Sequence, residues 1–298
     1  MPENARKYLD PEVLQGISGL YVKARLIVEG FVSGLHRSPF RGFSVEFAEH
    51  REYVPGDDVR HLDWKVYGKS DRFYIKQYEE ETNLRAWIFV DVSESMEYGS
   101  GALSKIEYAR TVAASLAYLI VRQRDAVGLC LFEQEVRRIL PPASSTGHLS
   151  ALVQALAETP TGGHTALGDV VHRTAEQLGR RGIIIIISDL LDETDSVLRA
   201  VRRLRHANHE VVLFHLLDRN ERTFPFQRST LFEGLEGYGD ITADPPALRQ
   251  AYLQELEQFV RTLRRGCLGD QVDFVDLDTH QHLDVALSRY LASRGARK

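Results

Sequence analysis

Three short oxygen-rich segments carry the residues of this chain that could do chemistry. In the first, D-x-S-x-S, the side chains of Asp91, Ser93 and Ser95 directly follow an apolar run. Asp189 follows a row of isoleucines in "IIIIISDL", and Thr165 follows two glycines in "PTGGHTALGD". Carboxylates and small hydroxyls, with no thiolate or imidazole, are the ligands that hard divalent cations prefer.

These segments require a scaffold that brings distant parts of the chain together. From about Leu84, short apolar strands alternate with amphipathic helices, which predicts a doubly wound, mostly parallel α/β sheet with helices on both faces. The expected strands are 86–92, 126–132, 182–188, 210–217 and 272–277. The expected helices are 105–124, 148–158, 165–178, 195–206, 246–264 and 283–293.

The row of isoleucines places one strand in the middle of the sheet, because a run that is apolar on both faces needs cover on both. Ligands of such sheets sit beyond the carboxyl ends of the strands, where the strand order reverses. We therefore expect Asp91 and Asp189 to converge if their strands are neighbours. Residues 135–140 predict an antiparallel edge strand before a turn at Pro141 and Pro142, and residues 220–244 predict an inserted loop or hairpin.

The chain divides into two predicted regions. Residues 1–82 form an N-terminal helical and β-rich segment, and residues 83–298 form the α/β domain. The composition, 43% hydrophobic and 27% charged residues, is typical of a globular protein. A net charge of −5 gives no electrostatic case for nucleic-acid binding. The two cysteines, the polar first residues and the absence of a long apolar stretch predict a cytoplasmic protein without membrane insertion.

The oxygen set predicts a magnesium site, with Mn²⁺ or Ca²⁺ as alternatives. We expect direct binding through Ser93, Ser95 and Thr165, and binding through water or directly by Asp91 and Asp189. Neutral direct ligands would leave the ion strongly electrophilic. Such a site favours an outside carboxylate, so we expect a protein partner that supplies an Asp or Glu.

Each of these residues also has a purely structural interpretation. Asp189 could form a turn or cap a helix, and the two serines could bond their own loop. Thr165 could cap a helix, with Asp169 in its first turn. The order of all three segments at two strand ends favours the metal interpretation over these separate ones.

An enzyme is the alternative function, namely a magnesium-dependent hydrolase or phosphotransfer enzyme that uses the same oxygen-rich site. The candidate base is His164, immediately before Thr165. The chain has no G-x-x-x-x-G-K-[ST] P-loop and no G-x-S-x-G elbow, so nucleotide hydrolysis and serine catalysis lack their sequence signals. We therefore expect a non-enzymatic protein.

The oxygen set resembles the metal-ion-dependent adhesion site of von Willebrand factor A-type domains. All five positions match, with Ser-Asp-Leu where that family often has Ser-Asp-Gly. Upstream, "GDDVRHLDW" resembles the G-D-D-x-R-x-(I/L)-D-W signature of the bacterial domain of unknown function 58 (DUF58) family. The matching residues are Gly56, Asp57, Asp58, Arg60, Leu62, Asp63 and Trp64.

This resemblance implies that the protein binds a protein partner and does not catalyse a reaction. Members of the family are often linked to MoxR-type AAA+ ATPases, so the chain is expected to be an adaptor for such an ATPase or its client, in the assembly or maturation of a protein complex. Many relatives carry transmembrane helices before this region, and this chain does not. In the signature, the charged residues could simply form turns and ion pairs around a small aromatic core. Alternatively, the signature forms a second partner contact through Asp57, Asp58, Arg60, Asp63 and Trp64.

Overall fold

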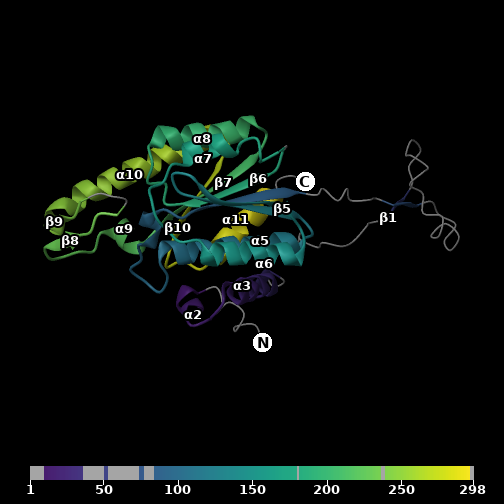
Figure 1. Ribbon diagram of the computed structural model, residues 1–298, viewed down its shortest axis with the longest axis horizontal. Coiled ribbons are helices and arrows are strands. Elements are labelled where there is room, and N and C mark those ends of the chain that lie inside the picture. The colour runs from purple at the N-terminus through teal and green to yellow at the C-terminus, as the bar shows by residue number, and fades with distance from the viewer. Residues whose placement is uncertain are drawn as a thin grey trace. The chain divides into compact units, whose positions relative to one another are not determined.

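The computed structural model describes residues 10–35, 50–52, 74–76, 84–179, 181–235 and 239–295 (Figure 1). By its internal contacts the chain splits into two compact units. The first consists of residues 1–34 together with 84–298, and the second of residues 35–83. The sequence had placed residues 1–82 in a single segment, whereas the contacts group the first helices with the α/β region.

A six-stranded sheet with the order β10-β7-β6-β3-β4-β5 forms the centre of the first unit. Neighbouring strands are parallel from β10 to β4, and β5 runs antiparallel along the edge. The strands are β3 (Arg85–Asp91), β4 (Ala126–Phe132), β5 (Val136–Ala143), β6 (Ile183–Ser188), β7 (Glu210–Leu217) and β10 (Asp273–Asp278). The predicted doubly wound α/β fold is confirmed, with each parallel strand within a residue of its expected position.

The strand order reverses between β3 and β6. From β3 the chain moves outward through β4 and β5, and it then returns to the other side of β3 to add β6, β7 and β10. Val90 of β3 lies opposite Ile187 of β6, so the two strands end side by side. This is the position where open α/β sheets bind ligands.

Helices cover both faces of the sheet. One face carries α5 (Lys105–Arg122), α6 (Thr146–Glu158) and α11 (Asp284–Gly295), and the other carries α7 (Leu167–Thr174), α8 (Thr194–His206) and α10 (Pro245–Gly269) (Figure 1). The short helix α2 (Pro11–Gln15) and the longer helix α3 (Leu20–Leu35) precede the sheet, and the ring of Tyr21 on α3 meets that of Tyr118 on α5.

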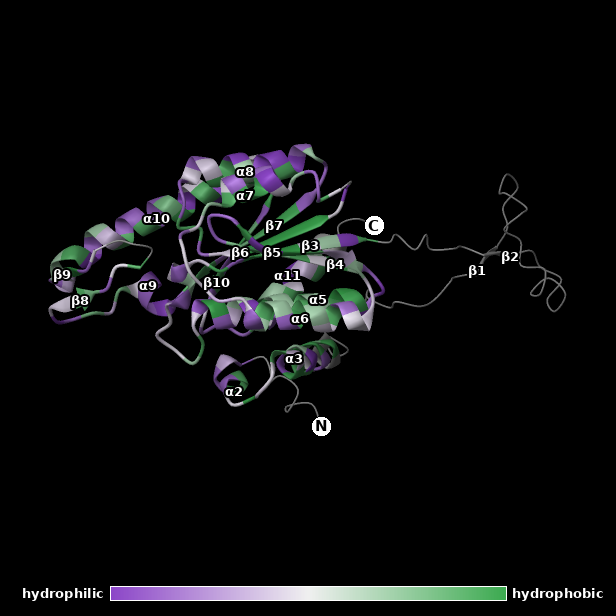
Figure 2. Cartoon of the chain, in the orientation of Figure 1, coloured by the Kyte–Doolittle hydropathy of each residue, from purple (hydrophilic) through white to green (hydrophobic). Residues whose placement is uncertain are grey.

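The strand β6 shows how the centre of the sheet is packed. All of its residues are buried, and the pleat sends Ile184 and Ile186 toward α7 and α8 and the alternate isoleucines toward the other face. Figure 2 shows the strands of the sheet as hydrophobic, whereas α8 is largely hydrophilic. Fully burying one such side chain stabilises the fold by about 1.5–3 kcal/mol. The sheet therefore gives fixed positions to the residues that follow its strands.

Two short segments complete the part of this unit that concerns the site. After β3 the chain forms the 3₁₀ helix η3 (Glu94–Glu97). After β7 it forms α9 (Arg219–Thr223) and an antiparallel pair, β8 (Thr230–Phe232) and β9 (Ile241–Ala243). The insertion predicted for residues 220–244 is therefore a short helix followed by a hairpin.

One local prediction was wrong. Pro141 and Pro142 were expected to form a turn after the edge strand, but both lie within β5. An edge strand tolerates proline because one side of its backbone has no neighbouring strand to bond.

In the second unit, β1 (His50–Glu52) pairs with β2 (Tyr74–Lys76) in antiparallel register. The predicted partner-contact residues Asp57, Asp58, Arg60, Asp63 and Trp64 lie outside the described residues. Among the helices that are described, none is both long enough and apolar enough to cross a membrane.

Candidate metal centre

The structure brings all five predicted oxygen ligands together beyond the ends of β3 and β6. Asp91 is the last residue of β3, and Asp189 directly follows β6. Ser93 is the N-cap residue of η3, Ser95 lies within η3, and Thr165 lies in the loop before α7. Because β3 and β6 are neighbours, the convergence expected from the sequence occurs here.

The carboxylate of Asp91 accepts hydrogen bonds on both oxygens. Thr165 Oγ1 donates to Oδ2 at 2.8 Å and Ser188 Oγ donates to the same oxygen at 2.5 Å. The backbone N–H of Ser93 donates to Oδ1 at 2.9 Å. Thr165 therefore does not cap α7, whose N-cap residue is Ala166. Its hydroxyl instead fixes the orientation of the Asp91 carboxylate.

A continuous line of hydroxyls joins the two carboxylates. Thr165 Oγ1 lies 3.1 Å from Ser93 Oγ, which in turn lies 3.1 Å from Ser95 Oγ. Ser95 Oγ donates to Asp189 Oδ2 at 2.8 Å. The site is thus a single cluster of oxygen atoms drawn from three separate segments.

The two carboxylates of the cluster are in different electrostatic situations. Asp91 and Asp189 are both 0% exposed. Among the described residues, no basic side chain forms an ion pair with Asp91. The pKa of Asp91 is raised to about 7, mainly by burial and secondly by the negative charge of Asp189. Within the part of the chain that the structure describes, ionised Asp91 is therefore a buried negative charge compensated by hydrogen bonds alone.

Asp189, in contrast, has a built-in cation. Lys105 Nζ lies 2.8 Å from Asp189 Oδ2 and 2.6 Å from Glu221 Oε1, and the lysine side chain is fully buried. Burial alone would lower the pKa of Lys105, but the two carboxylates outweigh it and raise that pKa above its usual value. The lysine therefore holds a permanent positive charge on one side of the cluster and ties α9 to it.

The residues present fit a hard divalent cation. All five side chains offer oxygen, and Asp91 is a buried carboxylate that lacks a cation. Within the described part of the chain, no group of three or more His, Cys, Asp or Glu side chains is placed to hold a metal ion. A cation at this cluster would therefore depend on hydroxyl ligands for much of its protein shell.

Backbone hydrogen bonds hold the two hydroxyl-bearing loops against each other. The N–H of Glu94 donates to the carbonyl of Gly163 at 3.0 Å, and the N–H of Gly162 donates to the carbonyl of Val92 at 2.9 Å. Gly163 has φ of +68°, and a Cβ added there would collide with the Glu133 carboxylate. Glycine at this position thus permits the left-handed backbone of the loop that leads to Thr165.

Leu190, the residue after Asp189, adopts a left-handed conformation with φ of +57°. A bulky residue in this region costs on the order of 1–2 kcal/mol. The side chain is fully buried in the core below α7 and α8, which compensates for the strain. Strained backbone of this kind is concentrated at functional sites.

Sequence reasoning missed three residues of this cluster. Ser188 ends β6 directly before Asp189, so the strand-end argument could have included it. Lys105 carried a weaker signal, because a lysine in the first turn of a helix opposes the helix dipole. Glu221 lies in the insertion after β7, where no periodic pattern indicated its position.

Comparison with known proteins identifies a matching family and several more distantly similar proteins. The sequence model of a family described as "Protein of unknown function DUF58" matches residues 49–259. An uncharacterized protein of Mycobacterium tuberculosis is 24% identical over 290 residues, which are 96% of this chain and 90% of that protein.

Two solved structures are similar at low identity. The conserved hypothetical protein BatB from Bacteroides thetaiotaomicron is 17% identical with a TM-score of 0.47, over 72% of this chain and 99% of that one. The SpRpn10 VWA domain is 13% identical with a TM-score of 0.44, over 69% of this chain and 94% of that one.

Proposed function

The chain belongs to the DUF58 family of proteins of unknown function, and we propose that it is a non-enzymatic adaptor that binds a protein partner through a divalent metal ion. The observation that carries this proposal is the convergence of five oxygen side chains at the switch point, where buried Asp91 has no cation among the described residues. An adaptor needs a site that is incomplete alone and is completed by its partner.

In this proposal Ser93, Ser95 and Thr165 hold the ion directly, and Asp91 and Asp189 hold it directly or through water. Mg²⁺ is the favoured ion, with Mn²⁺ or Ca²⁺ as alternatives. The ion would supply the positive charge that Asp91 lacks. Because Lys105 already neutralises part of Asp189, the protein offers little negative charge to the ion. This leaves a binding preference for a further carboxylate from outside.

That carboxylate is an Asp or Glu of the partner. Metal and partner would then each strengthen the binding of the other, because each completes the ligand shell that the other requires. We propose a MoxR-type AAA+ ATPase or its client as the partner, in assembly or maturation of a protein complex in the cytoplasm. This assignment rests on the resemblance of the DUF58 signature and not on the geometry of the site.

The burial of the cluster favours binding over catalysis. The hydroxyls of Thr165 and Ser95, which donate to Asp91 and Asp189, are only 3% and 4% exposed, so a substrate has little access to either as a nucleophile. His164 is exposed beside Thr165. We expect the isolated protein to hydrolyse neither nucleotides nor phosphoesters; turnover that is lost in Asp91→Ala would instead support the enzyme.

A pull-down from cytosol of the source organism tests the proposal. The baits are wild type in magnesium, wild type in chelator, Asp91→Ala in magnesium, and the exposed-site control Asp195→Ala in magnesium. An AAA+ ATPase or its client retained only by the wild type and the control in magnesium would support the adaptor. If all four baits retain the same proteins, the metal site has no part in association.

A further inference from the structure

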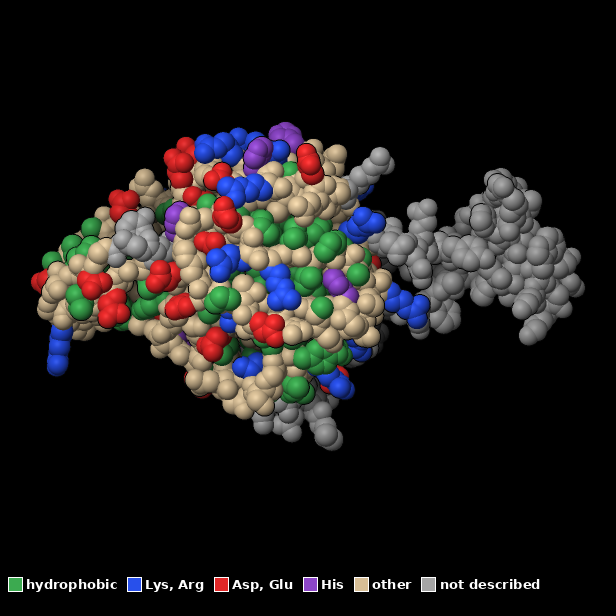
Figure 3. Space-filling model, viewed as in Figure 1, with side chains coloured by type: hydrophobic (Ala, Val, Ile, Leu, Met, Phe, Trp, Pro, Cys, Tyr) green, Lys and Arg blue, Asp and Glu red, His purple; other side chains and the backbone are tan. Residues whose placement is uncertain are grey.

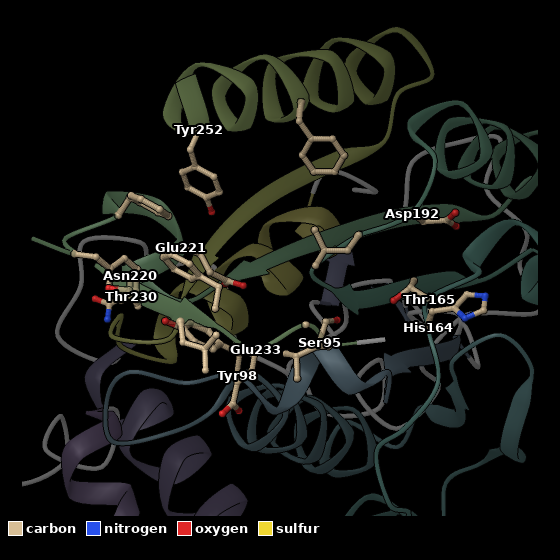
Figure 4. Close-up of a pocket in the computed structure, with 18 of the residues that line it drawn as sticks. Ser95, Tyr98, His164, Thr165, Asp192, Asn220, Glu221, Thr230, Glu233 and Tyr252 are labelled. Atoms are coloured by element: carbon tan, nitrogen blue, oxygen red, sulfur yellow. The ribbon is translucent and has the colours of Figure 1, made fainter. Parts of the chain in front are cut away.

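A large open cavity lies beside the oxygen cluster and shares two of its residues. Its volume is about 1250 Å³, and both Ser95 and Thr165 contribute to its lining. In Figure 4, Thr165, His164 and Asp192 lie toward one end, Thr230 and Asn220 lie toward the other, and Glu221 lies between. Pockets for small ligands commonly measure about 300–1,000 Å³. This cavity therefore has room for several side chains of a peptide.

The end of the cavity away from the oxygen cluster is aromatic. The ring of Phe224 stacks on Phe232 at 5.6 Å between centroids and lies 4.6 Å from Tyr252, while Phe226 meets Phe232 edge-on at 5.3 Å. Tyr252 points from α10 toward the cavity (Figure 4). Such clustered rings form a preorganised apolar surface for another bulky side chain.

Two aliphatic side chains of the lining are exposed although they are large. Leu191 is 49% exposed and Leu231 is 56% exposed. Outside the lining, Ile241 on β9 and Leu248 on α10 are also exposed, by 64% and 47%. On the face shown in Figure 3, hydrophobic and acidic side chains lie intermingled at this end of the molecule. Exposed large apolar side chains that line a cavity are typical of interaction sites in soluble proteins.

The charged side chains that line the cavity are acidic. The ionisable acids of the lining are Asp192, Glu193, Glu221 and Glu233, and no lysine or arginine is among its described residues. Lys105 neutralises part of this charge at Glu221, and Arg199 forms an exposed ion pair with Glu193 at 3.8 Å, which is weak in water. Asp192, Glu233 and the weakly paired Glu193 attract a cationic group, and a partner with acidic flanks would be repelled.

The backbone of β8 offers a third kind of contact. All three of its residues, Thr230 to Phe232, line the cavity. The described sheet contains only β8 and β9, so β8 has a backbone edge without a neighbouring strand. An extended peptide can add to such an edge through main-chain hydrogen bonds while its alternate side chains enter the pocket.

We infer that this cavity binds an extended segment of the partner protein in which bulky apolar side chains are flanked by Lys or Arg. The inference rests on the proposed function, because it describes the part of the partner that adjoins its metal-binding carboxylate. Aromatic rings receive the apolar side chains, Asp192, Glu193 and Glu233 receive the cations, and β8 pairs with the backbone. The shared Ser95 and Thr165 place the segment next to the metal.

Fluorescence anisotropy with three labelled, C-terminally amidated nine-residue peptides tests the inference in chelator. One peptide repeats Arg-Leu-Phe, the second has Glu in place of Arg, and the third has Ser in place of Leu and Phe. We expect the first to bind at least about tenfold more tightly than either of the others. Equal binding of all three peptides, or binding of none, would overturn the inference.

Surface variants locate the binding. Leu231→Ser and Glu233→Lys should each weaken the basic apolar peptide about fivefold or more, since each removes one lining group from an exposed position. The controls Leu268→Ser and Glu255→Lys change exposed residues outside the lining and should bind as wild type does. If the controls weaken binding as much as the lining variants, the peptide binds elsewhere.

A fourth peptide separates this inference from the metal proposal. It carries the basic apolar sequence with one added terminal Asp, and it is measured with and without magnesium on wild type and on Asp91→Ala. Tighter binding in magnesium that Asp91→Ala abolishes supports the metal-dependent function. Binding that is equal with and without magnesium contradicts that function. The relative affinities of the first three peptides still test, independently, whether the cavity binds a basic apolar segment.

Discussion

Asp91→Asn is the substitution that most directly tests the electrostatics of the oxygen cluster. The amide has nearly the same shape as the carboxylate but carries no charge. Its oxygen can accept from the N–H of Ser93, and its NH₂ can donate to Thr165 and Ser188 once these hydroxyls rotate to accept. The variant therefore keeps a hydrogen-bonded network and removes only the buried negative charge.

The size of the effect follows from the pKa of Asp91. The folded protein raises it from 3.8 to about 7, and the unfolded chain restores the lower value. A group with a raised folded pKa costs stability as pH rises from the unfolded value to the folded value, and the cost stays constant above that. Above pH 7 the full cost is about 4 kcal/mol, and at pH 5 it is roughly a third of this.

Urea unfolding in chelator at pH 5, 6, 7 and 8 measures this cost as a difference between two proteins. The stability of Asp91→Asn minus that of wild type should increase by roughly 2–3 kcal/mol from pH 5 to pH 8. The exposed control Asp195→Asn should show no such trend. Taking the difference removes the contributions of all other carboxylates, which are common to both proteins.

A difference that does not depend on pH would refute the reasoning, because Asp91 would then be ionised in the fold at no cost. A difference that decreases with pH would show that Asp91 is stabilised as a carboxylate without any added cation. Either result would remove the electrostatic argument for a metal ion at this cluster.

Four further outcomes follow from named contacts. Lys105→Met should destabilise the protein by about 3–5 kcal/mol in urea unfolding, because Asp189 and Glu221 lose their buried cation; an unchanged midpoint would show that the pair is not formed. Ser104→Ala removes one partner of the capping box at the start of α5 and should cost about 1 kcal/mol, measured in the same way. Ile185→Val in the fully buried β6 should cost about 0.5–1.5 kcal/mol, and a smaller loss than for the exposed Ile241→Val would contradict the burial assigned to β6. Magnesium should raise the thermal midpoint of wild type but not of Asp91→Ala, and equal shifts would place the ion elsewhere.

Much of the fold could be predicted because its signals are local and repeated. The strands that are buried on both faces are continuous apolar runs, and the helices between them carry apolar residues at helical spacing. The convergence of Asp91 and Asp189 then followed from one general property of doubly wound sheets, without any knowledge of side-chain contacts.

The parts that could not be predicted depend on tertiary contacts between segments with no shared pattern. Lys105 meets Asp189 across 84 positions and Glu221 across 116 positions of sequence. A single lysine in a first turn does not indicate which carboxylate it will bind. Similarly, the aromatic residues of the insertion after β7 were visible, but their assembly into one wall of a cavity required the position of α10.

The prolines of β5 show a different limit. Adjacent prolines usually indicate a turn, and the local signal at Pro141 and Pro142 was strong. The edge of the sheet overrode it, since a strand with one free side loses little when a backbone N–H is missing.

The two backbone bonds that join Gly162 and Gly163 to the loop after β3 have a consequence for local unfolding. Because the segment of Ser93 and Ser95 and the loop of Thr165 share these bonds, opening either of them breaks both bonds. Regions linked in this way open as one cooperative unit, with a single free energy of opening. The amides of Glu94 and Gly162 should therefore exchange their hydrogens at matching rates, and the hydroxyl ligands would be gained or lost together instead of one at a time.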